Sequence, residues 1–122
     1  MKKILLPLLA VALLAACGGG GGGGASQPSG STKVTMTEFK FDPSTITVAH
    51  GKVVFFLVNS GTTSHDMAIR DGSGNRLAIS DLVSAGDSSV FTVDNIAAGS
   101  YTIYCTQPGH ESSGMKGTLT VT

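Results

Sequence analysis

The chain has 122 residues, of which 13% are charged, and its 8 Lys and Arg residues balance 8 Asp and Glu residues. This length has room for one domain of ordinary size and no second hydrophobic core. The charged residues form no basic patch of the kind that binds nucleic acid, which excludes nucleic acid as a partner.

The N-terminal segment, residues 1–16, has the layout of a secretory signal peptide. Lys2 and Lys3 precede an apolar run of eleven residues that ends at Leu14, and a run of this length is too short to span a membrane as a stable helix. The sequence LAAC, which ends at Cys17, resembles the lipobox of bacterial lipoproteins. The resemblance implies that Cys17 is acylated and becomes the mature N-terminus. The alternative is ordinary cleavage next to an incidental cysteine.

A glycine-rich segment follows, and residues 17–32 are predicted to comprise the lipidated cysteine and a flexible tether. Seven consecutive glycines precede the sequence ASQPSGST, a composition with little to bury and great backbone freedom. As a coil, the residues after the cysteine would span about 20 Å on average. The expected location is therefore extracytoplasmic, with the protein anchored by lipid to a bacterial membrane in the periplasmic space or at the cell surface.

The remaining residues, 33–122, are predicted to form one all-β domain. β-Branched and aromatic residues fill short runs, and turn-forming pairs such as Asp42-Pro43 separate them. Seven or eight strands at this spacing predict an antiparallel sandwich or barrel. The apolar run VVFFLV is expected in the middle of a sheet, buried on both sides. The predicted strands are residues 33–39, 45–49, 53–59, 65–70, 88–93, 101–105 and 117–121, with a weaker candidate at 77–79.

Scarce residue types gather near the C-terminus, in the stretch YCTQPGHESSGM. The chain has 2 Cys and 3 His, and this stretch holds Cys105, His110 and Met115 at five-residue intervals. Farther upstream, His65 lies in the predicted strand 65–70. Strand alternation places His65 and Cys105 on the faces that carry apolar neighbours, so both are expected to point into the core.

The residues between Cys105 and His110 determine whether the two side chains can meet. Along a strand they would lie roughly 16 Å apart, and around a helix about 140° apart. The Pro-Gly pair between them is a strong turn signal, and Gly114 permits a second bend before Met115. With these turns, the three side chains can converge on one metal ion.

The donor types favour copper. Thiolate and thioether are soft ligands, and two imidazoles with one thiolate and a weak axial methionine are typical of blue copper centres. A structural zinc site would need four Cys or His ligands, and the third histidine, His50, lies in an apparent turn where it is expected to be solvated. Taken singly, Cys105 and Met115 could be core side chains and His65 a hydrogen-bonded core histidine. An unoccupied thiol at Cys105 would, however, be open to oxidation outside the cytoplasm.

The same residues resemble a known family. The sequences CTQPGHESSGMKGTLTV, NSGTTSHDMAI and FKFDPSTITVAHGKVVFFLVN together resemble the cupredoxins, the small blue copper proteins of the plastocyanin and auracyanin type. The resemblance covers residues 33–122 and implies that the all-β domain is a Greek-key β-sandwich of seven or eight strands. It implies three strong equatorial ligands to one type 1 copper ion, His65, Cys105 and His110. Met115 would be the long axial ligand, and His110 would lie near the surface as the electron exit.

One position departs from the commonest pattern of this family. Many cupredoxins have asparagine after the first histidine ligand, whereas this chain has Asp66. The Asp66 carboxylate can accept a hydrogen bond from the Thr106 hydroxyl or backbone N–H, so the tie between the two ligand loops is expected to remain. Its negative charge should favour oxidised copper. Asp66 and Glu111, which flank the site, are otherwise expected to be solvated charges, and Tyr104 an ordinary surface residue.

The predicted function is the transfer of single electrons by a membrane-tethered, extracytoplasmic blue copper protein. We expect a monomer without enzymatic activity, whose partner is a redox protein such as a c-type cytochrome or a membrane oxidoreductase complex. The alternative is copper handling, meaning delivery, storage or resistance, although Met115 is the one methionine near the ligands. Catalysis of the nitrite reductase kind needs a second, mostly histidine-ligated copper. A metal-free adhesin would leave the Cys105 thiol unprotected.

Overall fold

The computed structural model describes residues 24–122, so the predicted signal peptide, the predicted lipidation site Cys17 and the glycines up to residue 23 lie outside the described residues. Within residues 24–122 no helix is present, so none there could cross a membrane. The described chain forms nine strands: β1 (Thr32–Thr37), β2 (Lys40–Asp42), β3 (Thr45–Val48), β4 (Gly51–Asn59), β5 (Ala68–Arg70), β6 (Arg76–Ile79), β7 (Ser88–Ile96), β8 (Gly99–Tyr104) and β9 (Lys116–Val121).

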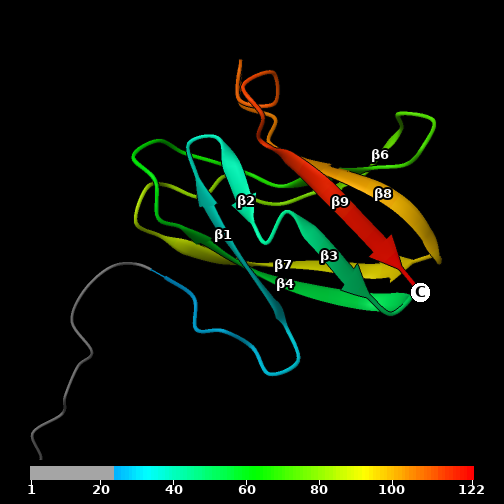
Figure 1. Cartoon of the computed structure of the whole chain (residues 1–122). Helices are drawn as coiled ribbons and strands as arrows, with labels where there is room; N and C mark the ends of the chain where they lie inside the picture. The colour runs from blue at the N-terminus through cyan, green and yellow to red at the C-terminus, as the bar shows by residue number, and fades with distance from the viewer. Residues whose placement is uncertain (1–23) are drawn as a thin grey trace, which may run out of the picture.

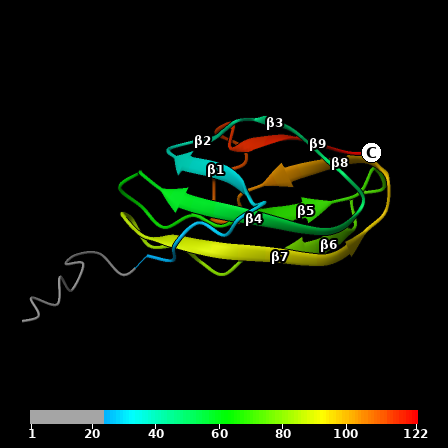
Figure 2. The same cartoon turned by 90° about the horizontal axis from the view of Figure 1, so that it is seen from below.

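The strands form two sheets, which confirms the predicted all-β sandwich (Figure 1). One sheet has the order β2-β1-β4-β7 and the other the order β3-β9-β8-β5-β6. In both views β4 runs beside β7 and β8 runs beside β9 (Figures 1 and 2). Two neighbouring pairs are parallel, β1 with β4 and β3 with β9. The expectation of a purely antiparallel arrangement is therefore wrong, because the chain crosses between the sheets at β3 and returns to the first sheet in the direction of β1.

Individual strands differ from the predicted runs, mostly at their ends. β2 was not predicted, because three residues are too few to show an alternating pattern. The predicted strand 65–70 is paired as β5 only from Ala68 onward, and His65 makes an isolated bridge to Val83. β7 continues three residues beyond the predicted end at position 93, to Ile96. The weak candidate at 77–79 is part of β6.

The hydrophobic core lies between the two sheets, and β4 contributes its centre. Phe55 is fully buried and stacks on Phe91 of β7, with ring centroids 5.8 Å apart. On the opposite face of β4, Phe56 is only 8% exposed, while Val54 and Val58 are half-buried. This interior strand is therefore largely covered on both sides, as its apolar sequence predicts.

The described end of the predicted tether lies against the sandwich. Gly24 forms an isolated bridge with Ser88 of β7, and the Ser88 hydroxyl donates a hydrogen bond to the carbonyl of Ala25 over 3.0 Å. β1 begins at Thr32, one residue before the predicted start of the domain.

One end of the sandwich gathers the loops that matter for function. The loop between β8 and β9 rises at the same end as the turn between β1 and β2 (Figure 1). Phe39 of that turn contacts His110 of the loop edge to face, with ring centroids 5.0 Å apart. Three of the predicted ligand residues, Cys105, His110 and Met115, belong to the loop between β8 and β9.

Removing the ring of Phe55 should lower the free energy of unfolding by about 3–5 kcal/mol, because Phe55→Ala leaves a cavity between the sheets. Chemical denaturation of the purified variant measures this loss. The matched control is Val90→Ala on β7, where the side chain is 38% exposed, and it should cost less than about 1 kcal/mol. Equal losses in the two variants would contradict the central position of Phe55 in the core.

Candidate metal centre

Two nitrogen atoms and one sulfur atom, from two distant segments of the chain, lie close together at this end of the sandwich. His65 Nδ1 lies 3.2 Å from His110 Nδ1. Cys105 Sγ lies 3.5 Å from His110 Nδ1 and 3.9 Å from His65 Nδ1. An ion in their plane, bonded at about 2.0 Å to nitrogen and 2.3 Å to thiolate, would separate the nitrogens by about 3.5 Å and each nitrogen from the sulfur by about 3.7 Å. The observed spacing fits a single ion.

The loop between β8 and β9 supplies Cys105, His110 and Met115. Cys105 follows β8 directly and is 1% exposed, and Met115 precedes β9 and is fully buried. The backbone N–H of Cys105 donates to the carbonyl of Met115 over 3.1 Å, and the N–H of Met115 donates to the carbonyl of His110 over 3.1 Å. These bonds close the loop on itself, so its three predicted ligand residues are held by the backbone.

The predicted turn between Cys105 and His110 is present. The N–H of His110 donates to the carbonyl of Gln107 over 3.0 Å. Gly109 has a φ of +79°, in the left-handed region that favours glycine, and Gly114 has a φ of +111° at the second bend. The chain therefore reverses twice between the thiol and the thioether, as the glycines in the sequence indicate.

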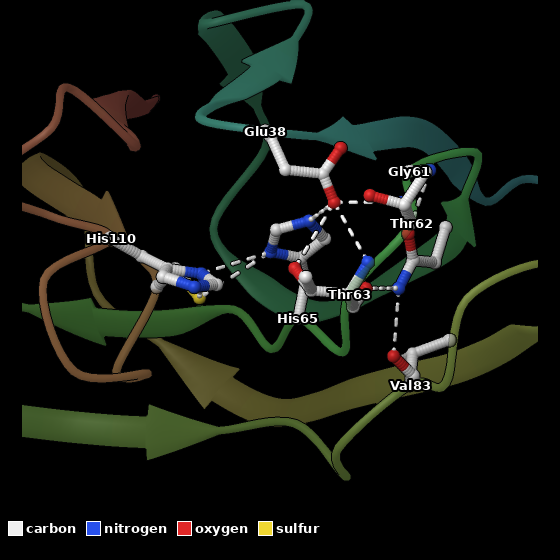
Figure 3. Close-up of polar contacts among 9 residues, drawn as sticks. Glu38, Gly61, Thr62, Thr63, His65, Val83 and His110 are labelled. Carbon is white, nitrogen blue, oxygen red and sulfur yellow. Dashed lines mark hydrogen bonds and ion pairs between the residues drawn. The ribbon is translucent and has the colours of Figure 1, made fainter.

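His65 is held by the segment between β4 and β5. It is fully buried, and its backbone exchanges hydrogen bonds of 3.0 and 2.8 Å with Val83. Asn59, also fully buried at the end of β4, donates to the carbonyls of Thr63 and Val83 over 2.8 Å each and accepts from the N–H of Gly61 over 2.9 Å. Figure 3 shows the resulting arrangement, in which the His65 ring faces the His110 ring. Asn59 thus fixes the backbone that carries the first histidine.

Asp66 ties the His65 segment to the loop after Cys105. Its Oδ1 accepts from the backbone N–H of Thr106 over 2.7 Å, and its Oδ2 accepts from the Thr106 hydroxyl and, over 3.4 Å, from the Gln107 amide. The predicted tie between the ligand loops is therefore confirmed. Asp66 is only 4% exposed, so the expectation of a solvated charge is wrong: its hydrogen bonds compensate for burial.

The second flanking carboxylate, Glu111, is paired. Arg70 Nη2 lies 2.5 Å from Glu111 Oε1, and the Arg70 guanidinium lies 4.3 Å from the centroid of the Tyr104 ring. The hydrogen bond from Arg70 lowers the pKa of Glu111 below its usual value. Glu111 is therefore not merely a solvated charge, and Tyr104 is a half-buried ring with one face covered by a cation, because β5 and β8 are neighbours in the sheet.

A carboxylate that the sequence did not indicate contacts the first histidine. Glu38, in the turn between β1 and β2, has its Oε1 3.2 Å from His65 Nε2. Hydrogen bonds from the backbone N–H groups of Thr63 and Thr62 lower the pKa of Glu38 to about 2. Glu38 and Asn59 were both missed, because a contact between residues 27 positions apart leaves no local pattern, and an asparagine at a strand end is also an ordinary turn residue.

The chemistry of the donors fits copper. Burial raises the pKa of the Cys105 thiol, which favours the protonated form. A metal ion therefore has to displace this proton in order to bind the sulfur as a thiolate. His50 is exposed, with Nδ1 2.8 Å from the carbonyl of Thr122, and is not part of the centre. Among residues 24–122, the ligand cluster holds one cysteine and two histidines, too few for a closed zinc site. With Met115 as the thioether, the four residues are positioned for a single type 1 copper ion.

Fold and donor set together define the class of mononuclear blue copper proteins, and comparison with known proteins agrees. The sequence pattern of the copper-binding proteins of the plastocyanin/azurin family matches residues 28–122. The chain belongs to this family.

Three relatives illustrate the range of the similarity. Plastocyanin of Dryopteris crassirhizoma is 38% identical over 94 residues, which cover 68% of this chain and 88% of plastocyanin. The structure of the oxidised form of this plastocyanin has a TM-score of 0.56 at 31% identity, and the match covers 75% of this chain and 100% of the plastocyanin chain. Auracyanin-B of Chloroflexus aurantiacus is 50% identical over 48 residues, which cover 39% of this chain and only 20% of that protein. An auracyanin B structure has a TM-score of 0.69 at 25% identity, covering 82% and 96% of the two chains. The copper-resistant cuproprotein CopI of Rubrivivax gelatinosus is 29% identical over 114 residues, covering 80% of this chain and 69% of CopI.

Asp66→Asn should raise the reduction potential of the copper-loaded protein by tens of millivolts, because it removes a negative charge that favours oxidised copper while keeping an acceptor for Thr106. Redox titration at constant pH measures the change. Asp94→Asn, which removes an exposed carboxylate from β7, controls for net charge and should leave the potential nearly constant. An unchanged potential in Asp66→Asn would remove this role of the Asp66 charge.

Proposed function

We propose that the protein carries single electrons between redox partners through one type 1 copper ion held by His65, Cys105, His110 and Met115. The observation that carries this proposal is the approach of two Nδ1 atoms and one Sγ atom to within 4 Å of one another. Bound copper would supply the one-electron couple, cycling between Cu(II) and Cu(I). The chain would supply the donor set and hold it in place.

A site held by the surrounding chain suits electron transfer, because little has to move when the charge of the ion changes. Cys105 and Met115 are joined by a backbone hydrogen bond, and His65 is fixed through Val83 and Asn59. Each ligand segment is thus held by contacts that do not depend on the metal. Such a frame hinders rearrangement towards the different geometries that Cu(I) and Cu(II) would each prefer, so exchange is fast.

The route for the electron follows from exposure. His65 and Cys105 are buried, whereas His110 is half-buried and contacts Phe39, which is 40% exposed. A partner that covers Phe39 and the edge of His110 would come closer to the metal than a partner bound over any of the buried ligands. A c-type cytochrome or a membrane oxidoreductase complex would be such a partner, and the protein would act as a monomer and as a carrier rather than an enzyme.

The location is proposed from the sequence. The lipobox-like LAAC and the glycine-rich segment support an extracytoplasmic lipoprotein tethered to a bacterial membrane through Cys17. Such an anchor would keep the copper domain at high local concentration near membrane-bound donors and acceptors. Stable anchoring takes more than one acyl chain.

Copper handling is the second candidate, and the similarity to the copper-resistant cuproprotein CopI favours it. In that role the metal itself would be delivered, stored or sequestered. The buried thiol and buried Met115 support electron transfer instead, since both ligands lie too deep for direct metal exchange with a partner. The two functions differ in whether copper stays bound through repeated reduction and oxidation.

Titration of the purified protein with Cu(II) should produce an intense blue absorption band that bleaches on reduction and returns on oxidation. The band arises from a thiolate bonded to copper, so Cys105→Ser should abolish it. The control is Ser80→Ala, which removes a hydroxyl that accepts a hydrogen bond from the Met67 N–H, and this variant should retain the band. Loss of copper during redox cycling would favour copper handling. Absence of copper binding in the unaltered protein would refute the proposed site.

Expression in a bacterial host with a labelled fatty acid should yield a labelled protein in the membrane fraction. Cys17→Ser should lose the label and move to the soluble fraction, since Cys17 is the proposed acylation site. Cys105→Ser provides the matched cysteine control and should stay labelled and membrane-bound. An unlabelled, soluble unaltered protein would show that the tether proposal is wrong.

A further inference from the structure

Glu38 contacts the buried histidine on the side opposite to the metal. The Nδ1 of His65 faces Cys105 and His110, whereas its Nε2 lies 3.2 Å from Glu38 Oε1 (Figure 3). His65 is fully buried and the Glu38 side chain is 26% exposed. The imidazole ring lies between the metal position and the carboxylate. A hydrogen bond that holds Nε2 therefore also sets the position and the protonation of Nδ1, the predicted ligand nitrogen.

The Glu38 carboxylate is held in place by several donors. Its Oε1 accepts from the backbone N–H groups of Thr62 and Thr63 over 2.7 and 2.8 Å, and from the Thr63 hydroxyl over 3.0 Å. The neighbouring Gly61 leaves the space that the carboxylate fills, since a Cβ there would come within 2.5 Å of Glu38 Oε1. The turn after β1 thus delivers a fixed negative group to His65.

We propose that Glu38 is a positioning residue, which holds the proton of His65 on Nε2, keeps Nδ1 free for copper, and biases the centre towards Cu(II). The inference rests on the proposed electron-transfer function, and it names a residue that sets the balance between Cu(II) and Cu(I) at the same site. When a carboxylate accepts the hydrogen bond from the second ring N–H of a ligand histidine, it fixes the tautomer and the orientation of the ring. It also makes the other ring nitrogen a stronger ligand for the metal. An ionised acceptor also stabilises the more positive oxidation state through its charge.

A purely structural role for Glu38 would be limited to joining the β1–β2 turn to residues 61–63. Glu38→Gln separates the two roles, because the amide oxygen can still accept from Thr62 and Thr63 while the negative charge is lost. Gly61→Ala provides the complementary change, since the added methyl displaces the carboxylate but leaves its charge in the protein. Asp94→Asn removes an exposed carboxylate near the start of β4, at the end remote from Asn59.

The decisive measurement is redox titration of the copper-loaded variants at constant pH. At a fixed ambient potential, Glu38→Gln should lower the ratio of oxidised to reduced protein by about tenfold, which for one electron corresponds to about 59 mV. Gly61→Ala should shift the ratio in the same direction, and Asp94→Asn should change it less than about twofold. Equal ratios in Glu38→Gln and Asp94→Asn would overturn the electrostatic part of the proposal.

A second readout needs no copper. Imidazole nitrogen chemical shifts in the copper-free protein report the tautomer of His65, which should be protonated on Nε2 in the unaltered chain and mixed in Glu38→Ala and Gly61→Ala. An unchanged tautomer in both variants would overturn the positioning role. If Glu38→Ala does not fold, Gly61→Ala decides. Failure of the unaltered protein to form a blue centre would refute the proposed function, yet the tautomer measurement would still test whether Glu38 orients His65.

Discussion

The approach of two imidazole nitrogens and one thiol sulfur is the constraint on which the rest of this structure depends. The three side chains come from two segments, with His65 about forty residues before Cys105 and His110, and each must give up water to reach the others. Polar groups at such a depth are unfavourable unless they are hydrogen-bonded or bonded to a metal. The surrounding loops are arranged to meet that cost through backbone and carboxylate contacts.

The two histidines are supported differently. His65 lies at the bottom of the centre, where Asn59, Val83 and Glu38 restrict both its backbone and its ring. His110 lies nearer to the surface and is oriented by the turn of its own loop and by Phe39. One side of the centre is therefore rigid and closed, while the other is accessible, which is the asymmetry that a protein exchanging electrons with partners requires.

The sequence predicted the strand-rich sandwich and the convergence of His65, Cys105, His110 and Met115, because each left a local signal. Alternation marked the strands, and the Pro-Gly turn marked the reversal after the thiol. The parallel strand pairs, the burial of Asp66 and the partners of Glu111 had no such signal. Each depends on which segments become neighbours after folding. Their contacts are set by the crossing of the chain between sheets rather than by nearby residues.

The attraction between Arg70 and Glu111 depends on the ionic strength of the solution. Both side chains are about one third exposed, so dissolved ions screen their attraction. The bonds of Asp66 to Thr106 are buried beside Cys105 and are screened far less. Rising ionic strength therefore loosens the outer flank of the loop that carries His110 and leaves the join between the His65 and Cys105 segments intact. The ionic strength of the surrounding solution thus acts on the accessible histidine first.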